Sequence, residues 1–355
     1  MKSIQILDRK IGCDYPVYFI ADIAANHDGD LERAKDLIYL AAEAGADAAK
    51  FQNFRAETIV SDFGFRALGD KFSHQANWEN SVFDVYDAAS LPLEWTPILN
   101  QTCIDAGIHY FTAPYEIEMV VELSDYVCAW KIGSGDITWL EHIKNIARLG
   151  KPVMLATGAA EWEDVERAAE AVLSETDDLV LMQCNTNYTG SRENFRFIGL
   201  NVLKEYTRAF PMVLLGLSDH TPGHTTVLGA VALGARVIEK HFTDDVARMG
   251  PDHTFSMDPV SWKDMVSATE DLDAALGDTK KRVMDNEQET VVLQRRAIRA
   301  GKMISAGEEI CKEMLIYLRP CPTDGIPPFR EELIIGKRAN RDIAAGDCIR
   351  QGDVL

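Results

Sequence analysis

Short apolar runs alternate with segments of helical periodicity along most of this chain. The apolar runs lack the polar alternation of a half-exposed strand, which predicts parallel strands that are buried on both faces. Eight such runs occur, at residues 17–23, 48–52, 109–112, 127–132, 153–156, 179–183, 212–217 and 237–241. Apolar residues three and four positions apart predict amphipathic helices at residues 31–44, 94–106, 140–149, 161–173, 197–206, 225–233 and 259–276.

Eight strand repeats separated by helices predict an α/β fold, a closed (β/α)8 TIM barrel. We expect the barrel at residues 1–280, a linker at 281–295 and a small β-rich domain at 296–355. In the last region, residues 304–310 and 343–349 share the pattern Ile-x-Ala-Gly-x-x-Ile, which indicates two copies of one turn-and-strand unit. Residues 55–89 interrupt the barrel pattern after the second strand and are predicted to lie over its carboxyl end.

The composition of the chain limits which molecules the protein is expected to bind and in which cellular compartment it is expected to work. The 355 residues carry a formal net charge of -20, which disfavours binding to nucleic acid or to an anionic membrane, so an anionic substrate needs a local cationic pocket. The seven cysteines form no Cys-x-x-Cys pair, which favours reduced thiols. No window has the apolar length of a membrane span. We expect a cytoplasmic protein without a leader.

Lysines stand at the ends of three predicted strands. Lys50, Lys131 and Lys240 occupy these positions, where a barrel presents polar side chains to its active site. A single lysine there is most often solvated, but three together predict an anion pocket. Ser134, between two glycines, adds hydroxyl and backbone N–H donors for a phosphate or carboxylate.

Two histidines end neighbouring strands. His220 and His241 follow the seventh and eighth predicted strands, so their rings are expected to meet at one metal site with open positions for water and a substrate oxygen. Mixed nitrogen and oxygen ligands suit Mn, Co, Zn or Fe.

Carboxylates and one thiol complete the strand ends. Asp22, Asp136, Glu239 and Asp252 either orient hydroxyls and transfer protons or pair with the lysines. Cys184 has no activating partner nearby in the sequence, and we do not expect it to act as a nucleophile.

At this point the chain resembles the sialic acid synthases, which include N-acetylneuraminic, legionaminic and pseudaminic acid synthases. The C-terminal part resembles their antifreeze-like (SAF) domain, through Arg319-Pro320, Gly325-Ile326 and Gly336-Lys337. The barrel carries the resemblance in Asn26-His27, Lys50-Phe51-Gln52, Lys131-Ile132-Gly133-Ser134-Gly135, Gly216-Leu217-Ser218-Asp219-His220, Glu239-Lys240-His241-Phe242, Gly250-Pro251-Asp252 and Ser256-Met257.

The resemblance implies a transferase that condenses phosphoenolpyruvate with the open-chain aldehyde of an N-acylated mannosamine-like sugar. The products are a nine-carbon 2-keto acid and phosphate. It implies that His220 and His241 hold a divalent metal, most often Mn²⁺, with Mg²⁺ or Co²⁺ as alternatives. Phosphoenolpyruvate is expected to bind Lys50, Gln52, Lys131, Ser134 and Ser218.

The remaining roles carried over concern proton transfer and the sugar. Asp136 is expected to handle protons, and Asp22 joins it among the catalytic residues. Asp252, Tyr188 and Asn77 are expected to contact the sugar. Arg319 is expected to reach the site of a partner subunit, which implies a domain-swapped homodimer.

Departures from the family pattern lie on the sugar side. Asp22 stands where the family commonly has Glu, Thr186 where Asn or Ser is usual, and Tyr188-Thr189-Gly190 replaces Tyr-Pro. They leave the acceptor sugar open. Two alternatives also stay open: a phosphoenolpyruvate-dependent synthase acting on a phosphorylated aldose, and a non-catalytic carbohydrate-binding or ice-interacting protein.

Overall fold

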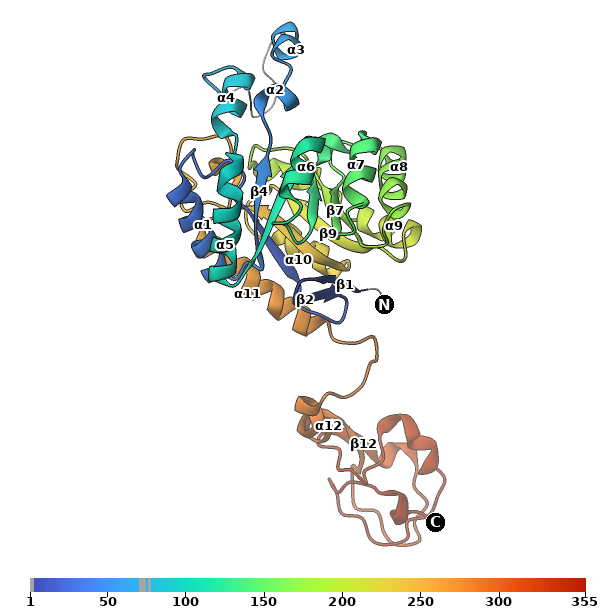
Figure 1. Ribbon diagram of the computed structural model, residues 1–355. Helices are drawn as coiled ribbons and strands as arrows, with labels where there is room; N and C mark the ends of the chain where they lie inside the picture. The colour runs from blue at the N-terminus through green and yellow to red at the C-terminus, as the bar shows by residue number, and fades with distance from the viewer. Residues whose placement is uncertain (1–2, 70–74, 76–77) are drawn as a thin grey trace. The chain divides into compact units, whose positions relative to one another are not determined.

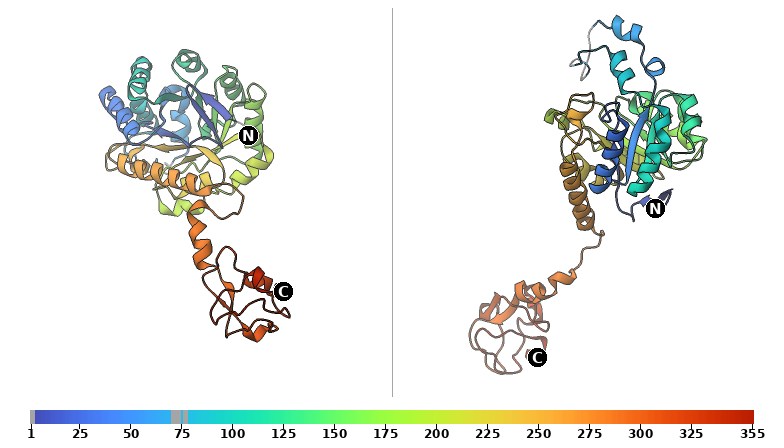
Figure 2. Two further views of the ribbon diagram at one scale, coloured as in Figure 1. Left: turned by 90° about the horizontal axis from the view of Figure 1, so that it is seen from below. Right: turned by 60° about the vertical axis from the view of Figure 1, so that its left-hand side comes forward.

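The computed structural model describes residues 3–69, 75 and 78–355. Among these residues, eight parallel strands pair in the order β10-β3-β4-β5-β6-β7-β8-β9 and close into a barrel surrounded by helices (Figures 1 and 2). The predicted (β/α)8 barrel is therefore confirmed. The strands are β3 (Tyr18–Asp22), β4 (Ala48–Asn53), β5 (His109–Pro114), β6 (Trp130–Ile132), β7 (Val153–Ala156), β8 (Leu179–Cys184), β9 (Leu214–Asp219) and β10 (Ala235–His241).

Helices cover the outside of the barrel. All seven predicted helices are present, with ends within five residues of those expected, and α6 was not predicted. The helices are α1 (Leu31–Glu43), α5 (Thr96–Ala106), α6 (Ile117–Leu123), α7 (Leu140–Ala147), α8 (Trp162–Leu173), α9 (Val202–Ala209), α10 (Thr225–Ala232) and α11 (Pro259–Leu276).

Local signals in the sequence set where these helices begin. The Asp30 side chain accepts hydrogen bonds from the Glu32 and Arg33 amides and starts α1. Asp258 caps α11 in the same way, and Pro259 follows it at the first helical position, where a missing N–H costs nothing. Each cap leaves the preceding residues free to form a loop at the carboxyl end of the barrel.

Two apolar cores hold the barrel together. One lies between strands and helices, and the other fills the barrel interior with residues such as Phe111 and Val237. A hairpin that the sequence analysis missed, β1 (Ser3–Ile6) and β2 (Arg9–Gly12), adds Ile4, Ile6 and Ile11 to the interior core. Figure 1 shows it at the amino end of the strands. This end is thereby closed, which leaves the carboxyl end for a site.

The segment after β4 forms three short helices, α2 (Ala56–Ile59), α3 (Asp62–Ala67) and α4 (Val82–Ala89). Figure 1 shows them beyond the end of the barrel at which β4 finishes, where the insertion was predicted to lie. The short 3₁₀ helix η2 (Leu93–Trp95) then leads into α5.

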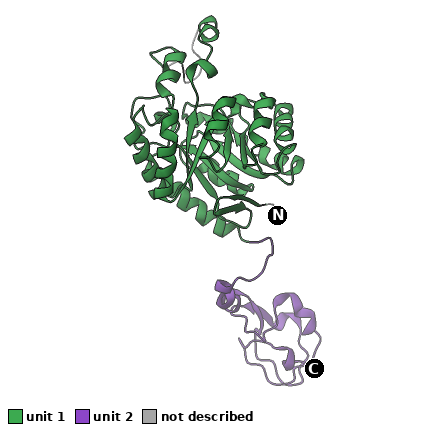
Figure 3. Ribbon diagram, viewed as in Figure 1, with its two compact units in different colours: residues 1–277 green, residues 278–355 purple. Residues whose placement is uncertain are grey.

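Residues 278–355 form a second compact unit, with the first at 1–277 (Figure 3). Its sheet pairs β11 (Ala297–Ala300) antiparallel to β12 (Leu315–Leu318). The two predicted repeat units pair with each other, since Ile304 and Ile343 exchange backbone hydrogen bonds of 3.0 and 2.8 Å. The residues expected as a linker include the 3₁₀ helix η6 (Asp285–Glu287) and α12 (Gln288–Gln294). Across the described residues, no helix is long and apolar enough to cross a membrane.

Candidate active site

The interior of the barrel changes from apolar to charged towards its carboxyl end. Side chains alternate between the two faces of a strand, so residues two positions beyond the interior core residues Ile20, Ala48, Ala129 and Val237 also point inward. Those residues, all buried, are Asp22, Lys50, Lys131 and Glu239.

Each of the two interior lysines is paired with a carboxylate. Lys50 Nζ lies 2.7 Å from Asp22 Oδ2 and 3.8 Å from Glu239 Oε2, and Lys131 Nζ lies 3.2 Å from Glu239 Oε1. Ser218 Oγ donates to Glu239 Oε1 at 3.0 Å. Burial by itself would raise the pKa of Glu239, but the two ammonium groups outweigh it and lower that pKa. Two cations and two anions therefore form one balanced, buried cluster.

Lys240 does not join this cluster, and the prediction of three converging lysines is wrong for it. Its position between the inward-facing Glu239 and His241 turns it to the outer face of the barrel. There its Nζ lies 2.5 Å from Asp219 Oδ2 and donates to the Thr221 carbonyl at 2.6 Å. Lys240 is thus a structural residue behind the site.

His220 and His241 lie side by side at the mouth of the barrel, because β9 and β10 are adjacent, with ring centroids 5.4 Å apart. His220 Nδ1 donates to the Asn185 carbonyl at 3.0 Å. Burial by itself would lower the pKa of His220, but its hydrogen bond with Cys184 outweighs burial and raises it. His241 Nε2 lies 3.5 Å from Asp22 Oδ2, and its Nδ1 is buried without a hydrogen-bond partner. Burial, together with the nearby charges, lowers the pKa of His241 well below its usual value, so its ring is neutral and able to bind a metal.

The donor set fits a divalent metal only if water or substrate completes it. In the part of the chain that the structure describes, no group of three or more His, Cys, Asp and Glu side chains is arranged to hold an ion. Two imidazoles and the unpartnered Nδ1 of His241 are the observations that favour a metal here.

Cys184 has a partner that the sequence did not reveal. Burial by itself would raise the pKa of this thiol, but a hydrogen bond with His220 and one with Ser134 outweigh burial and lower it. The partner lies 36 residues further along the chain and meets Cys184 only because β8 and β9 are adjacent in the barrel.

Ser134 and Asp136 lie in a short 3₁₀ helix, η3 (Ser134–Asp136), directly after β6. Ser134 Oγ accepts from the Gly158 amide at 2.9 Å. A Cβ at position 158 would lie 1.9 Å from Thr186 Oγ1, so only glycine fits against this wall. Burial, which Lys131 opposes, raises the pKa of Asp136 to about 6. Asp136 is therefore able to exchange a proton near neutral pH.

An aromatic pocket opens above the histidines and the charged cluster. It holds about 680 Å³ of space, including space open to solvent, with Gln52, His241 and Asp252 among its lining residues. Burial raises the pKa of Asp252 to about 6. The insertion after β4 supplies part of the wall, as predicted. The aromatic side chains of the wall are Phe54, Trp78, Tyr86, Tyr115 and Tyr188.

Of these five, only Tyr188 was predicted as a site residue. The one available signal for Phe54, Trp78 and Tyr86 was the aromatic content of residues 54–89, whose lack of periodicity hides which side chains face inward. Tyr188 contacts His220 edge to face, with ring centroids 4.4 Å apart. Among the other predicted residues, Asn77 lies outside the described part of the chain, and Arg319 is exposed on the second unit.

A barrel with its polar and charged side chains gathered at the carboxyl end of the strands has the architecture of a (β/α)8-barrel enzyme. A model of the NeuB family matches residues 37–281, and a SAF domain model matches residues 295–355. The chain belongs to the NeuB family and ends in a SAF domain.

Three relatives illustrate what the chain is similar to. An N,N'-diacetyllegionaminic acid synthase of Legionella pneumophila is 34% identical, over 94% of each chain. A pseudaminic acid synthase of Campylobacter jejuni is also 34% identical, over 96% of this chain and 97% of the relative. The crystal structure of a sialic acid synthetase from Leptospira borgpetersenii in complex with citrate aligns with a TM-score of 0.71 at 27% identity, covering 82% of this chain and 95% of that one.

Proposed function

We propose that this protein is a nonulosonate synthase that condenses phosphoenolpyruvate with the aldehyde of an N-acylated mannosamine-like sugar. One observation carries the proposal: a buried cluster containing Lys50 and Lys131 lies beneath an adjacent pair of histidines and an aromatic pocket. The names of the relatives, which are legionaminic and pseudaminic acid synthases, agree with it.

Phosphoenolpyruvate would bind at the barrel interior. Lys131 and Lys50 provide the positive charge, while Ser134, Ser218 and Gln52 provide neutral hydrogen-bonding groups for its phosphate and carboxylate. Asp22 and Glu239 hold both lysines in place before the ligand arrives. Pre-placed cations lose little conformational freedom on binding, which favours affinity for an anion.

The acceptor sugar would occupy the aromatic pocket above. Tyr188 and Asp252 line this pocket beside His241. The ring of Tyr188 suits the apolar face of a sugar, and the carboxylate of Asp252 suits its hydroxyl groups. His220 and His241 would hold a divalent metal, Mn²⁺ in the first place, which supplies a Lewis acid for the acceptor aldehyde.

The reaction then makes one carbon–carbon bond and one carbon–oxygen bond, and it breaks one carbon–oxygen bond. C3 of phosphoenolpyruvate attacks the aldehyde carbon, water adds to C2, and phosphate leaves with cleavage of its bridging C2–O bond. The water oxygen becomes the keto oxygen, and the two water protons end on the former aldehyde oxygen and on the phosphate. Asp136, whose pKa is about 6 and is influenced by the charge of Lys131, would accept a proton from the adding water.

The direct test measures phosphate release from phosphoenolpyruvate with N-acetylmannosamine, with 2,4-diacetamido-trideoxyhexoses of manno and altro configuration, and with phosphorylated counterparts. Each acceptor is tested with Mn²⁺ and with EDTA. We expect release with one unphosphorylated sugar, and its loss in EDTA. With ¹⁸O in the bridging position of phosphoenolpyruvate, the label should appear in phosphate.

Two results would overturn the proposal. Release only with phosphorylated aldoses would favour the related class of synthase. No release with any acceptor, while phosphoenolpyruvate or a sugar still binds, would favour a binding protein.

A further inference from the structure

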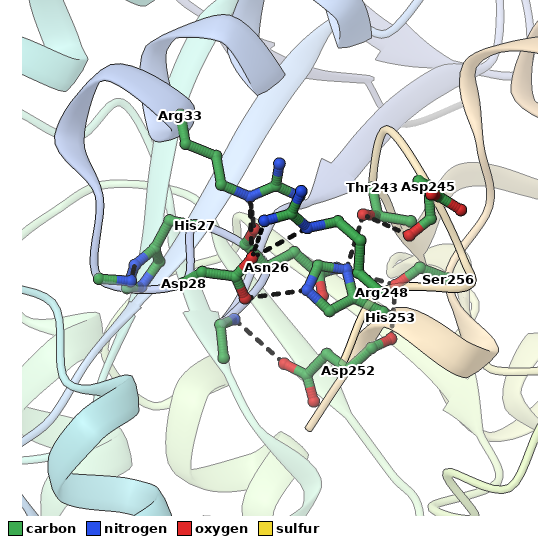
Figure 4. A network of polar contacts seen from close by, with 12 residues as sticks. Asn26, His27, Asp28, Arg33, Thr243, Asp245, Arg248, Asp252, His253 and Ser256 are labelled. Atoms are coloured by element: carbon green, nitrogen blue, oxygen red, sulfur yellow. Dashed lines mark hydrogen bonds and ion pairs between the residues drawn. The ribbon is translucent and has the colours of Figure 1, made fainter. Parts of the chain in front are cut away.

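A polar network joins the loop after β3 to the loop after β10, beside the aromatic pocket (Figure 4). Its centre is the carboxylate of Asp28, which lies 2.9 Å from His253 Nε2, 2.9 Å from an Arg248 guanidinium nitrogen and 3.1 Å from Arg33 Nε. Asp28 holds a left-handed backbone conformation with φ of 52°, which Asp tolerates better than most residues. Arg33 on α1, together with Arg248 and His253 from the loop after β10, therefore surrounds one carboxylate.

His253 is fully buried and satisfied on both sides of its ring. Its Nε2 carries the proton towards Asp28, because a carboxylate only accepts, and its Nδ1 lies 2.8 Å from Thr243 Oγ1. The loop folds tightly over the ring: a Cβ at Gly250 would lie 2.6 Å from His253 Cδ2. The position of His253 is thus set by contacts on three sides.

The residue before His253 is Asp252, which lines the pocket. Its Oδ2 accepts from the Ala25 amide at 3.1 Å and lies 3.9 Å from His241 Nδ1. Its carbonyl accepts from Ser256 Oγ at 2.7 Å, and Ser256 Oγ accepts in turn from Asn26 at 2.9 Å. The two loops therefore hold Asp252 from both sides, and neither loop does so alone.

We propose that Asp28 and His253 are positioning residues, which fix the Asp252 carboxylate at the acceptor side of the pocket. This inference rests on the proposed function. Neither residue lines the pocket. Both act through the peptide that carries Asp252, so their loss should change how the acceptor binds and should leave the interior lysine cluster untouched.

The first variant to test is Asp28→Asn, because Asn keeps the shape of the side chain and tolerates the same backbone conformation. Asp244→Asn is the matched control: Asp244 also pairs with Arg33, through contacts of 2.8 and 2.6 Å, and makes no contact with His253. We expect Asp28→Asn to raise the KM for the acceptor by roughly 10- to 100-fold, the effect of losing a charged hydrogen bond. The KM for phosphoenolpyruvate should stay within about twofold, and Asp244→Asn should match the wild type.

A second pair of variants separates positioning from folding. His253→Gln retains an N–H donor for Asp28 and should recover acceptor binding in part, whereas His253→Phe retains the volume without the donor and should not. Direct calorimetric titration of the acceptor sugar gives the same comparison without turnover.

The outcomes distinguish this inference from the proposed function. If the wild type releases no phosphate with any acceptor, the proposed function fails. If the wild type is active and Asp28→Asn keeps the wild-type acceptor KM, or raises both KM values equally, only the positioning role is overturned.

Discussion

Lys131 Nζ lies 3.2 Å from Glu239 Oε1, and both side chains are only 4% exposed. The cation of the proposed donor site is therefore paired before any ligand arrives. An incoming anion has to share Lys131 with Glu239, and it does so in a region where interactions between charges are strong because water is excluded.

Replacing Lys131 should weaken binding of phosphoenolpyruvate. Lys131→Met is expected to raise the KM for phosphoenolpyruvate by roughly 10- to 100-fold, since a hydrogen bond to a charged group contributes about 1.5–3 kcal/mol. Lys151→Met is the control, because Lys151 donates to the Ser124 and Val127 carbonyls and contributes nothing to the pocket. Steady-state kinetics with varied phosphoenolpyruvate would measure both. Equal KM values in the two variants would contradict the assignment.

Removing either of the two histidines should weaken binding of Mn²⁺. His220→Ala and His241→Ala are each expected to lower affinity for Mn²⁺ by at least about tenfold, because one imidazole alone is a weak site. Electron paramagnetic resonance of free Mn²⁺ during titration measures this without turnover. His142→Ala serves as the control, since His142 is equally buried but bonds to the Pro114 carbonyl. Unchanged affinity in His241→Ala would place the metal elsewhere.

Asp136 should give the pH profile a limb near pH 6. Burial raises its pKa to about 6, so the carboxylate becomes available as a base only as the pH rises through that value. We expect kcat/KM to increase between about pH 5 and 7, and Asp136→Asn to be roughly 100-fold slower with a smaller limb, since Asp252, whose pKa is also about 6, still titrates in that range. Asp244→Asn, which removes a carboxylate whose pKa is about 2, should keep the wild-type limb.

The raised pKa of Asp136 should also make the stability of the folded protein fall as the pH rises, whereas the activity should increase. The folded protein holds the Asp136 proton more tightly than the unfolded chain does, so this contribution is complete below about pH 4 and disappears as the pH rises through about 6. Asp136→Asn should therefore gain stability relative to the wild type between pH 4 and pH 8. A constant difference across that range would show that folding does not raise the pKa of Asp136.

Lys240→Met should destabilise the barrel by about 3–5 kcal/mol, because it leaves the carboxylate of Asp219 buried without a cation. Arg236→Met should have a smaller effect: Arg236 is also on the outer face of β10, but its partner Asp273 is one-third exposed. Urea unfolding followed by tryptophan fluorescence reports on the barrel, since all six tryptophans precede residue 278. A similar loss of unfolding free energy in both variants would contradict the prediction that the buried Lys240–Asp219 pair is the more costly one to break.

Arg319 can be tested by mixing two impaired variants and assaying them at a phosphoenolpyruvate concentration well below the KM of Lys131→Met. If Arg319 serves the site of a partner subunit, random pairing of Arg319→Ala with Lys131→Met chains restores about a quarter of the wild-type activity, because half of the dimers contain one intact site. If Arg319 serves its own chain, mixing restores nothing. Light scattering on the wild type gives the oligomeric state independently.

The pattern of apolar residues located the barrel strands and most of the helices. A strand buried on both faces needs a continuous apolar run, and a helix buried along one side needs apolar residues three and four positions apart. It missed the β1–β2 hairpin, in which the strands are four residues long and the buried side chains are Ile4, Ile6 and Ile11. It also missed α6, a helix of seven residues, which is too short for its pattern to stand out.

Lys50, Lys131, His220 and His241 were also identified from the sequence, because each stands at the end of a predicted apolar strand. A strand that serves only the core has no need for a charged or imidazole side chain there. The sequence did not separate Lys240 from them. Whether a residue faces the interior depends on its phase within the strand, and a shift of one position reverses it.

The type and order of the barrel strands and of most of its helices, and the residue types available for chemistry, were thus determined by the sequence alone. Only the tertiary structure decided which of those residues meet. Closure of the barrel sets β10 beside β3 and so brings His241 and Glu239 to Asp22 and Lys50, about 200 residues apart in the chain. The same closure sets the loop that holds Asp252 against the loop that holds Asp28. A contact between residues so far apart in the chain produces no periodic pattern in the sequence, because it places no requirement on the residues between them.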